Sequence, residues 1–307
     1  MDVIARKNIV KMVAVSCGKV LINKMLMLIT LCLMACSSPN VYNDLNVSSP
    51  IVQSEYELGI AFGGGGVRGF MHLGVIKALE EAGIKADVVS GTSAGSIAAT
   101  LYASGMSFEE MAVAIENIGM FDIADFVLSS KGLVNGKSLS DWVNAQVAYD
   151  DLADMPIPVA VTATNMTTHK TVIIRSGNPG KAVQTSSTIP GVFLPVEHLG
   201  DILIDGGIFS VVPVYTARKL GAKKVIAVDI YCANQTKPGA SASKLTLAVF
   251  RMQSCRLSQQ ELESADVVIA PLYEPAGSAA FDDKEKAIEA GYIATMAVIT
   301  QIRSGLN

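Results

Sequence analysis

The chain has 307 residues, of which 50% are hydrophobic and 17% are charged, and its formal net charge is −4. A disordered chain combines low hydrophobicity with high net charge, so this composition excludes disorder and predicts a large core. Lysines and arginines do not gather along any segment, which excludes the basic stripe that is typical of nucleic-acid-binding proteins.

The first residues are predicted to form a secretory leader. Two lysines precede an apolar run over residues 25–34, which is too short to span a bilayer. The run leads into Leu-Met-Ala-Cys, which resembles a bacterial lipoprotein signal. That resemblance implies that Cys36 is lipidated and becomes the first residue of the mature protein. An uncleaved anchor is the alternative interpretation, and Met12 and Met25 are alternative start residues.

Three parts are expected along the chain. The leader covers residues 1–36, and residues 37–56 are predicted to be a flexible tether, because they are rich in Ser, Asn and Pro and lack periodicity. Residues 57–303 are predicted to form one folded domain. Two cysteines fall within it, Cys232 and Cys255. Buried cysteine usually behaves as a small hydrophobe, and pairing in an oxidising compartment is the alternative.

Within the folded domain, strand-like runs alternate with helical ones. This pattern predicts an α/β fold, a three-layer sandwich with a largely parallel central sheet. Strands are expected at residues 57–62, 87–90, 159–164, 171–175, 202–204, 225–230 and 267–271. Helices are expected at residues 69–82, 95–103, 138–147, 179–187, 214–220, 245–263 and 283–303, with a further helix capped by Ser107. Residues 121–127 are assigned to the core, and a lid or membrane-contacting surface is the alternative.

The first chemical motif is Gly-Thr-Ser-Ala-Gly at residues 91–95, between a predicted strand and a helix of small residues. This is the context of a nucleophile elbow, in which a sharp turn exposes the serine hydroxyl and Gly91 and Gly95 make room for the backbone. The following helix directs free N–H groups towards developing negative charge. Ser93 is therefore the candidate nucleophile, and a turn whose glycines serve packing alone is the alternative.

The second motif is the run Gly-Gly-Gly-Gly-Val-Arg-Gly at residues 63–69, again between a strand and a helix. Unshielded backbone N–H groups in such a loop bind a phosphate or hold the oxyanion of acyl transfer. The spacing of Gly64, Gly66 and Gly69 also fits a dinucleotide fingerprint. That fingerprint needs an acidic residue at the end of the second strand. Here the second strand runs directly into the Ser93 turn, so the oxyanion interpretation is favoured.

A nucleophilic serine needs a base, and histidine is the usual one. The chain has three candidates, His72, His169 and His198. Each is interpreted as an ordinary core or surface histidine, and a Ser-His-Asp triad of the α/β-hydrolase type is the alternative. The motif Asp205-Gly206-Gly207 ends a predicted strand and offers a carboxylate, which can take the serine proton from about 3 Å. Taken alone, Asp205 would be an ordinary turn aspartate.

The three motifs in this order resemble the patatin-like phospholipase family, in particular its bacterial branch related to neuropathy target esterase. The resemblance covers residues 57–303. Further segments that resemble the family are residues 186–196, 224–229, 265–269 and the Gly-Tyr pair at 291–292. The glycine loop of the family often opens with Asp, and Gly63 holds that place here, as it does in many bacterial members.

The resemblance implies a Ser-Asp dyad that works without histidine, metal or cofactor. Ser93 would attack an ester carbonyl to form an acyl-enzyme, and Asp205 would accept its proton and later activate water. The oxyanion is assigned to the glycine-rich loop, namely the amides of Gly64, Gly65 and Gly66 with help from Arg68.

The expected substrate is a phospholipid, a lysophospholipid or another acyl ester. The expected place is the bacterial cell envelope, anchored by lipid in the outer membrane and facing the periplasm, since no aspartate follows Cys36 as a retention signal. No nucleic-acid partner is expected, and the oligomeric state is not predicted. A lipoprotein that binds lipid or a partner without catalysis is the remaining alternative.

Overall fold

The computed structural model describes residues 38–47, 54–234, 241–275 and 281–306. The predicted leader and Cys36 lie outside these residues. The chain divides into two compact units, one of residues 39–126 and 131–307, the other of residues 1–38 and 127–130. The described residues of the second unit contain no helix or strand. The first unit carries the fold.

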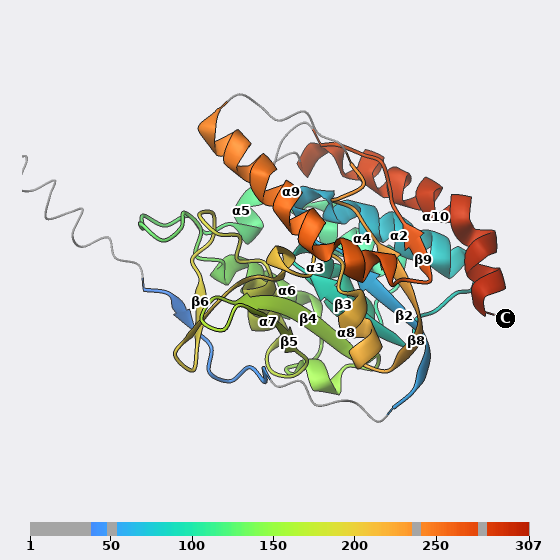
Figure 1. Cartoon of the computed structure of the whole chain (residues 1–307), viewed down its shortest axis with the longest axis horizontal. Helices are drawn as coiled ribbons and strands as arrows, with labels where there is room; N and C mark the ends of the chain where they lie inside the picture. Colours follow the sequence, from blue (N-terminus) through green and yellow to red (C-terminus); the bar gives the residue numbers. More distant parts are fainter. Residues whose placement is uncertain (1–37, 48–53, 235–240, 276–280, 307) are drawn as a thin grey trace, which may run out of the picture. The chain divides into compact units, whose positions relative to one another are not determined.

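A sheet of nine strands forms the centre of the first unit (Figure 1), in the order β1-β6-β7-β4-β3-β2-β8-β9, with β5 also paired to β4. Neighbours from β4 through β3, β2 and β8 to β9 run parallel, whereas β5 and β7 pair with β4 in antiparallel fashion. The strands are β1 (Asn40–Val41), β2 (Tyr56–Phe62), β3 (Val88–Thr92), β4 (Val159–Asn165), β5 (Lys170–Ile174), β6 (Val196–His198), β7 (Asp201–Asp205), β8 (Ala222–Val228) and β9 (Val267–Ile269).

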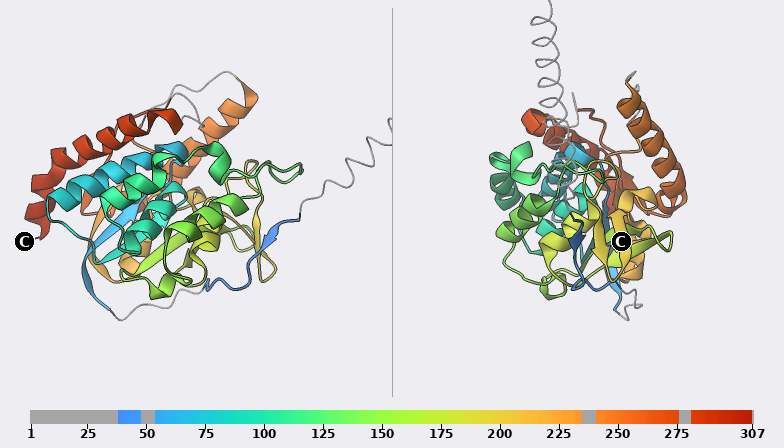
Figure 2. Two further views of the ribbon diagram at one scale, coloured as in Figure 1. Left: turned by 180° about the vertical axis from the view of Figure 1, so that it is seen from behind. Right: turned by 90° about the vertical axis from the view of Figure 1, so that its left-hand side faces the viewer.

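Helices cover both faces of the sheet (Figure 2), which gives the predicted three layers. Helices α2, α3, α4, α6, α7 and α10 lie on one face, and α8 and α9 lie on the other. The helices are α2 (Phe70–Glu81), α3 (Ala94–Ala103), α4 (Phe108–Glu116), α5 (Met120–Ile123), α6 (Lys137–Gln146), α7 (Pro179–Ser186), α8 (Val214–Lys219), α9 (Ala242–Glu263) and α10 (Lys284–Leu306).

Strand β2 shows why two separate cores form. Successive side chains of a strand point to opposite faces, so Ile60 and Phe62 pack into the larger core under α2 and α10. Between them, Ala61 packs into the smaller core under α8. All three side chains are fully buried, as expected for a parallel strand that is covered on both faces.

The tether prediction for residues 37–56 is wrong in part. Strand β1 pairs with β6, Leu45 is buried, and Asn46 forms an isolated bridge with Ser176. A two-residue edge strand leaves no periodicity in the sequence, because distant partners define it. The core assignment of residues 121–127 is also wrong for Phe121 and Phe126, whose exposed fractions are 83% and 57%.

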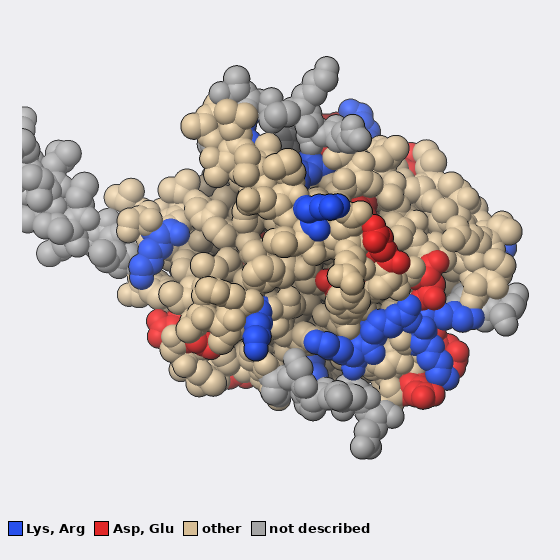
Figure 3. Space-filling model, in the orientation of Figure 1, with Lys and Arg blue, Asp and Glu red and all other residues tan. Residues whose placement is uncertain are grey.

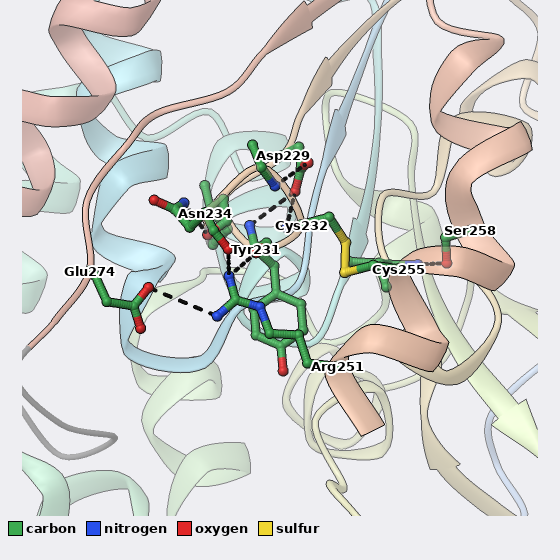
Figure 4. Close-up of a disulfide and its surroundings, with 11 residues drawn as sticks. Asp229, Tyr231, Cys232, Asn234, Arg251, Cys255, Ser258 and Glu274 are labelled. Atoms are coloured by element: carbon green, nitrogen blue, oxygen red, sulfur yellow. Dashed lines mark hydrogen bonds and ion pairs between the residues drawn. A yellow bond between two sulfur atoms is a disulfide. The ribbon is translucent and has the colours of Figure 1, made fainter. Parts of the chain in front are cut away.

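A disulfide joins Cys232, in the segment after β8, to Cys255 in α9 (Figure 4). It replaces the default interpretation of these cysteines as free hydrophobes. Beside it, Arg251 from α9 donates hydrogen bonds to the carbonyls of Tyr231 and Asn234. The middle of α9 is therefore fixed covalently and by charge-assisted hydrogen bonds. In the described part of the chain, no helix combines the length and the apolar character needed to cross a membrane.

Candidate active site

Ser93 lies on a sharp turn between β3 and α3. Its backbone has φ 52° and ψ −124°, a conformation that residues with a side chain rarely adopt. Two neighbours hold this turn. The Ser93 amide donates to Ser186 Oγ at 2.8 Å, and the Ser93 carbonyl accepts from the amide and the hydroxyl of Ser96, at 2.8 Å and 2.6 Å. The strained geometry is that of the predicted nucleophile elbow.

The flanking glycines are required by close backbone contacts. A Cβ on Gly95 would lie 2.0 Å from the carbonyl oxygen of Phe62, and one on Gly91 would lie 2.3 Å from the carbonyl oxygen of Gly95. No side chain fits at such distances. These glycines let the start of α3 press against the end of β2, where the glycine-rich loop begins.

The glycine-rich loop lies directly against the nucleophile, since a Cβ on Gly64 would be 3.3 Å from Ser93 Cβ. The Gly64 amide already donates to the carbonyl of Val211 at 2.9 Å. The amides of Gly65 and Gly66 have no acceptor among the described residues. The geometry therefore does not support the Gly64 amide as an oxyanion donor. The amides of Gly65 and Gly66 stay candidates for that role. Just beyond them, a Cβ on Gly69 would lie 3.0 Å from Ala94 Cβ at the start of α3.

Arg68 contacts the loop from outside. Its guanidinium forms an ion pair with Glu274 and donates to the Gly65 carbonyl at 3.3 Å. It also lies 5.5 Å from the ring centroid of Tyr231, and Arg251 lies 4.5 Å from the same ring. Through the Gly65 carbonyl, Arg68 holds the peptide unit that carries the free Gly66 amide. Arg68 thus holds the loop, and among the described residues it forms no hydrogen bond or ion pair with Ser93.

The three histidines are held by backbone contacts or lie in a turn. Nε2 of His72 is 2.8 Å from the carbonyl of Gly63, and burial lowers the pKa of this histidine to about 4, so the neutral ring supports the loop as a donor. Nδ1 of His198 is 2.6 Å from the carbonyl of Tyr42. His169 lies in the turn between β4 and β5. Among the described residues, no hydrogen bond joins any of them to Ser93 or Asp205.

Sheet register carries Asp205 towards Ser93. Thr92, next to Ser93, is paired with Thr162 of β4, and their hydroxyl oxygens are 2.6 Å apart. The following residue of β4, Ala163, is paired with Asp205 at the end of β7. Ser93 and Asp205 therefore lie on the two sides of β4, where neighbouring strands are about 4.8 Å apart.

One carboxylate oxygen of Asp205 is satisfied and the other is not. Oδ1 accepts from the Gly207 amide at 2.7 Å, whereas the buried Oδ2 has no partner in hydrogen-bond geometry among the described residues. Burial raises the pKa of Asp205 to about 6, and the nearby Ser93 hydroxyl and the Gly207 amide oppose this rise. Ser93 and Asp205 are therefore neighbours that are not locked together.

The two glycines after Asp205 have different neighbours. A Cβ on Gly206 would lie 2.5 Å from the carbonyl oxygen of Thr162, so only glycine lets this turn pack against β4. A Cβ on Gly207 would lie 2.9 Å from Oδ1 of Asp205. The Asp-Gly-Gly sequence thus positions the carboxylate.

Several residues of the site gave no functional signal in the sequence. Ser186 falls in the segment that resembles the family, but its bond to the Ser93 amide was not predicted. Tyr231, Arg251 and Glu274 belong to no motif, and their convergence beside Arg68 depends on the tertiary fold. The described residues contain no group of three His, Cys, Asp or Glu side chains that could hold a metal ion.

The fold and the site together define an α/β protein that presents a serine on a strand-to-helix elbow beside a carboxylate and a glycine-rich loop. Residues 60–218, just over half of the chain, match the family model described as patatin-like phospholipase. This stretch contains Ser93 and Asp205. The chain therefore belongs to the patatin-like phospholipase family.

The relatives are proteins of very different length. The chain is 32% identical over 196 residues to lysophospholipase NTE1 of Mycosarcoma maydis, covering 62% of this chain and 10% of that protein. It is 30% identical over 188 residues to mouse patatin-like phospholipase domain-containing protein 6, covering 58% and 14%. An uncharacterized NTE family protein of Mycobacterium bovis is 31% identical over 179 residues, covering 58% and 50%. The match thus spans at most half the length of these relatives.

A solved structure shares the fold. The crystal structure of VipD from Legionella pneumophila matches with a TM-score of 0.53 over 86% of this chain and 71% of that chain. The sequence identity is 16%, so this likeness supports the architecture alone. It agrees with the predicted α/β sandwich and its largely parallel sheet.

Proposed function

We propose that this protein is a serine lipid-acyl hydrolase with a Ser93-Asp205 dyad. Ser93 Oγ bonds to the acyl carbon of an ester while its proton passes to Asp205 Oδ2. The ester C–O bond then breaks, and the proton passes to the leaving alkoxide. Water attacks the acyl-enzyme, Asp205 takes the proton of that water, and the proton returns to Ser93 as the acid departs. The free amides of Gly65 and Gly66 would hold the oxyanion in both steps.

The unpartnered oxygen of Asp205 carries this proposal. A buried carboxylate oxygen without a hydrogen-bond donor is costly, and a catalytic role is one explanation for such a group. The Ser93 hydroxyl is close enough to Asp205 to act on its pKa. A pKa of about 6 leaves the carboxylate mostly ionised at neutral pH and still basic enough to accept a proton.

The histidine triad is less well supported. His198 is bound to a backbone carbonyl next to β1, and His72 is neutral and bound to Gly63. Among the described residues, neither histidine forms a hydrogen bond with Ser93. Because two curated relatives are named a lysophospholipase and a phospholipase domain protein, phospholipids and lysophospholipids are the substrates to test first.

The proposed location is the bacterial cell envelope, with Cys36 lipidated and the domain facing the periplasm. The Cys232–Cys255 disulfide supports this, because disulfides persist in oxidising compartments and are rare in the cytosol. The resemblance of residues 33–36 to a lipoprotein signal supplies the anchor.

The test is hydrolysis of phosphatidylcholine and lysophosphatidylcholine by wild type, Ser93→Ala, Asp205→Ala and His198→Ala, purified side by side. We expect Ser93→Ala and Asp205→Ala to fold and to lose nearly all turnover, while His198→Ala retains it. Loss of activity in His198→Ala with retention in Asp205→Ala would favour the triad. A wild type that neither hydrolyses ester nor reacts with a fluorophosphonate would favour a binding protein without catalysis.

A further inference from the structure

Four exposed apolar side chains gather around the first strand of the fold. They are Val41 in β1, Phe121 in α5, Phe126 after it, and Leu133, with exposed fractions of 55%, 83%, 57% and 57%. We call these four residues the apolar patch. Single exposed apolar residues are common, but two exposed phenylalanines beside a leucine and a valine are not.

Printed contacts join the members of the patch across three chain segments. Asn40 of β1 donates to the backbone and the side-chain oxygens of Asn135, at 2.9 Å and 2.7 Å. The preceding residue, Val134, forms a bridge with Phe126. The rings of Phe126 and Phe121 pack edge to face with centroids 6.1 Å apart. The four residues therefore lie on three chain segments that contact one another, and the two phenylalanine rings touch directly.

The same segment leads to the candidate active site. Gln184 of α7 donates to the Asn135 carbonyl at 3.0 Å, and Ser186, two residues on, accepts from the Ser93 amide. Further along, the carbonyl of Thr188 accepts from the Asp205 amide, and the carbonyl of Val192 accepts from Leu133. One short stretch, residues 184–192, thus contacts the patch and both members of the dyad.

The start of β1 limits how far the fold can lie from a lipidated Cys36. Only four Cα–Cα steps separate Cys36 from Asn40, which is at most about 14 Å in an extended chain. The predicted tether would have reached roughly five times farther, up to residue 57. Because residues 40–46 are docked on the domain, a lipid on Cys36 would hold the patch itself at the bilayer surface.

We propose that the apolar patch inserts into the interface of the lipid bilayer and orients the active site towards its substrate. The inference rests on the lipid anchor of the proposed function. A lipid on Cys36 would fix one point of the protein at the membrane, and a second contact would fix its orientation. Phenylalanine and leucine side chains are typical of the apolar faces that bury at the boundary between headgroups and acyl chains.

Charged side chains lie at both ends of the sheet, because Val41 of β1 is paired in register with Glu197 and the nearby Asp44 side chain is 52% exposed. Figure 3 shows lysines and arginines gathered over α8 and β8, at the far end of the sheet from β1 in Figure 1. There Lys223 pairs with Glu55 and Glu57, and Arg218 pairs with Asp266. These charged side chains favour contact of the α8 and β8 end with water. A second copy of the chain fits the patch less well, because four partly exposed side chains offer a few hundred Å², below the roughly 800 Å² per partner of a stable interface.

Lipid quenching tests the contact in the full chain, purified from membranes and reconstituted into phosphatidylcholine–phosphatidylglycerol vesicles. Trp142 is the only tryptophan, so Trp142→Phe gives a silent background. Phe126→Trp in that background should be quenched at least about twofold by brominated lipid. The matched control is Met296→Trp. Met296 is 43% exposed and belongs to α10, a helix that lies away from β1 in Figures 1 and 2. Equal quenching at the two positions would overturn the proposal.

Activity gives a second readout. Phe121→Ser with Phe126→Ser should lower the ratio of vesicle hydrolysis to soluble-ester hydrolysis by roughly tenfold. The matched pair on α10, Ile293→Ser with Met296→Ser, should leave this ratio unchanged. An equal fall of this ratio in both variant pairs would refute a lipid contact. A change of the Phe121 and Phe126 variant from dimer to monomer, with lipid quenching at position 126 no greater than at position 296, would also refute it.

The two proposals fail in different ways. A wild type that hydrolyses neither substrate would refute the hydrolase, while the quenching result would still decide the patch. Cys36→Ser should release the protein from the membrane fraction. Full retention of Cys36→Ser together with unquenched Phe126→Trp would refute the orientation without touching the dyad.

Discussion

Asp205 and Asp229 are both buried aspartates at the ends of strands in the same sheet, with exposed fractions of 6% and 2%. Asp229, after β8, accepts from three backbone amides, those of Tyr231, Cys232 and Ala233, at 3.0, 2.7 and 3.0 Å. Asp205, at the end of β7, accepts from one amide and leaves Oδ2 without a partner.

The difference separates a carboxylate that builds structure from one that is available for chemistry. Hydrogen bonds to a charged group are worth about 1.5–3 kcal/mol each, so Asp229 stabilises the turn that carries Cys232. The free oxygen of Asp205 costs stability in the resting protein. It leaves room for a proton from Ser93 or from water.

The largest expected effect is on catalysis. Asp205→Asn keeps the shape of the side chain and removes its basicity, so kcat/KM should fall by about 10³–10⁴ while the melting temperature stays unchanged or rises. The matched variant Asp229→Asn should retain kcat/KM within a few-fold. Steady-state ester hydrolysis measures both values. Equal losses of activity in the two variants would contradict the different roles of Asp205 and Asp229.

Stability should respond in the opposite order. Asp229→Ala removes the charged acceptor of three partly buried amides, so the free energy of unfolding should fall by about 3 kcal/mol. Asp205→Ala removes a poorly satisfied buried carboxylate and should be close to neutral. Urea unfolding followed by circular dichroism measures both values. A larger loss for Asp205→Ala would contradict the structural role of Asp229.

The disulfide beside Asp229 should stabilise the fold without taking part in chemistry. It closes a loop with a sequence separation of 23, so reduction should cost about 3 kcal/mol in the free energy of unfolding. We expect Cys232→Ser with Cys255→Ser to unfold at lower urea whether or not reductant is present. Wild type should match it only when reductant is added. If wild type unfolded at the same urea concentration with and without reductant, the disulfide would not form.

A smaller effect concerns a third buried acid. Burial raises the pKa of Glu261 in α9 from 4.5 to about 7, although its carboxylate accepts from the Tyr215 amide at 2.8 Å. Between pH 4.5 and 7 the folded protein therefore binds a proton that the unfolded chain has released, so stability falls as pH rises. Asp205 adds a slope of the same sign up to about pH 6.

Glu261→Gln isolates this contribution, because the amide oxygen still accepts from Tyr215. Between pH 4 and pH 8, the stability of the variant relative to wild type should rise by about 3 kcal/mol. Thermal unfolding across this range measures the difference. A pH-independent difference between the two proteins would show that Glu261 stays ionised in the fold.

Part of the fold and of the site could be predicted from the sequence. Long apolar strands and the motifs around Ser93 and Asp205 were predictable, because periodicity and glycine positions are local properties. Strand β1 was not, because its only definition is the pairing with β6. Asp229 and Asp205 both follow apolar strands, and no local pattern tells which one keeps a free oxygen. The engagement of the Gly64 amide with Val211 depends in the same way on a distant partner.

The central claim is that Asp205, and no histidine, activates Ser93. The most direct measurement is the rate at which a fluorophosphonate modifies Ser93 between pH 4 and 9 in wild type, Asp205→Asn and His198→Ala. We expect one modified residue, a wild-type rate that rises through a pKa of about 6, the same profile for His198→Ala, and a flat, slow rate for Asp205→Asn. A wild-type rate in Asp205→Asn, or a profile that disappears in His198→Ala, would contradict it.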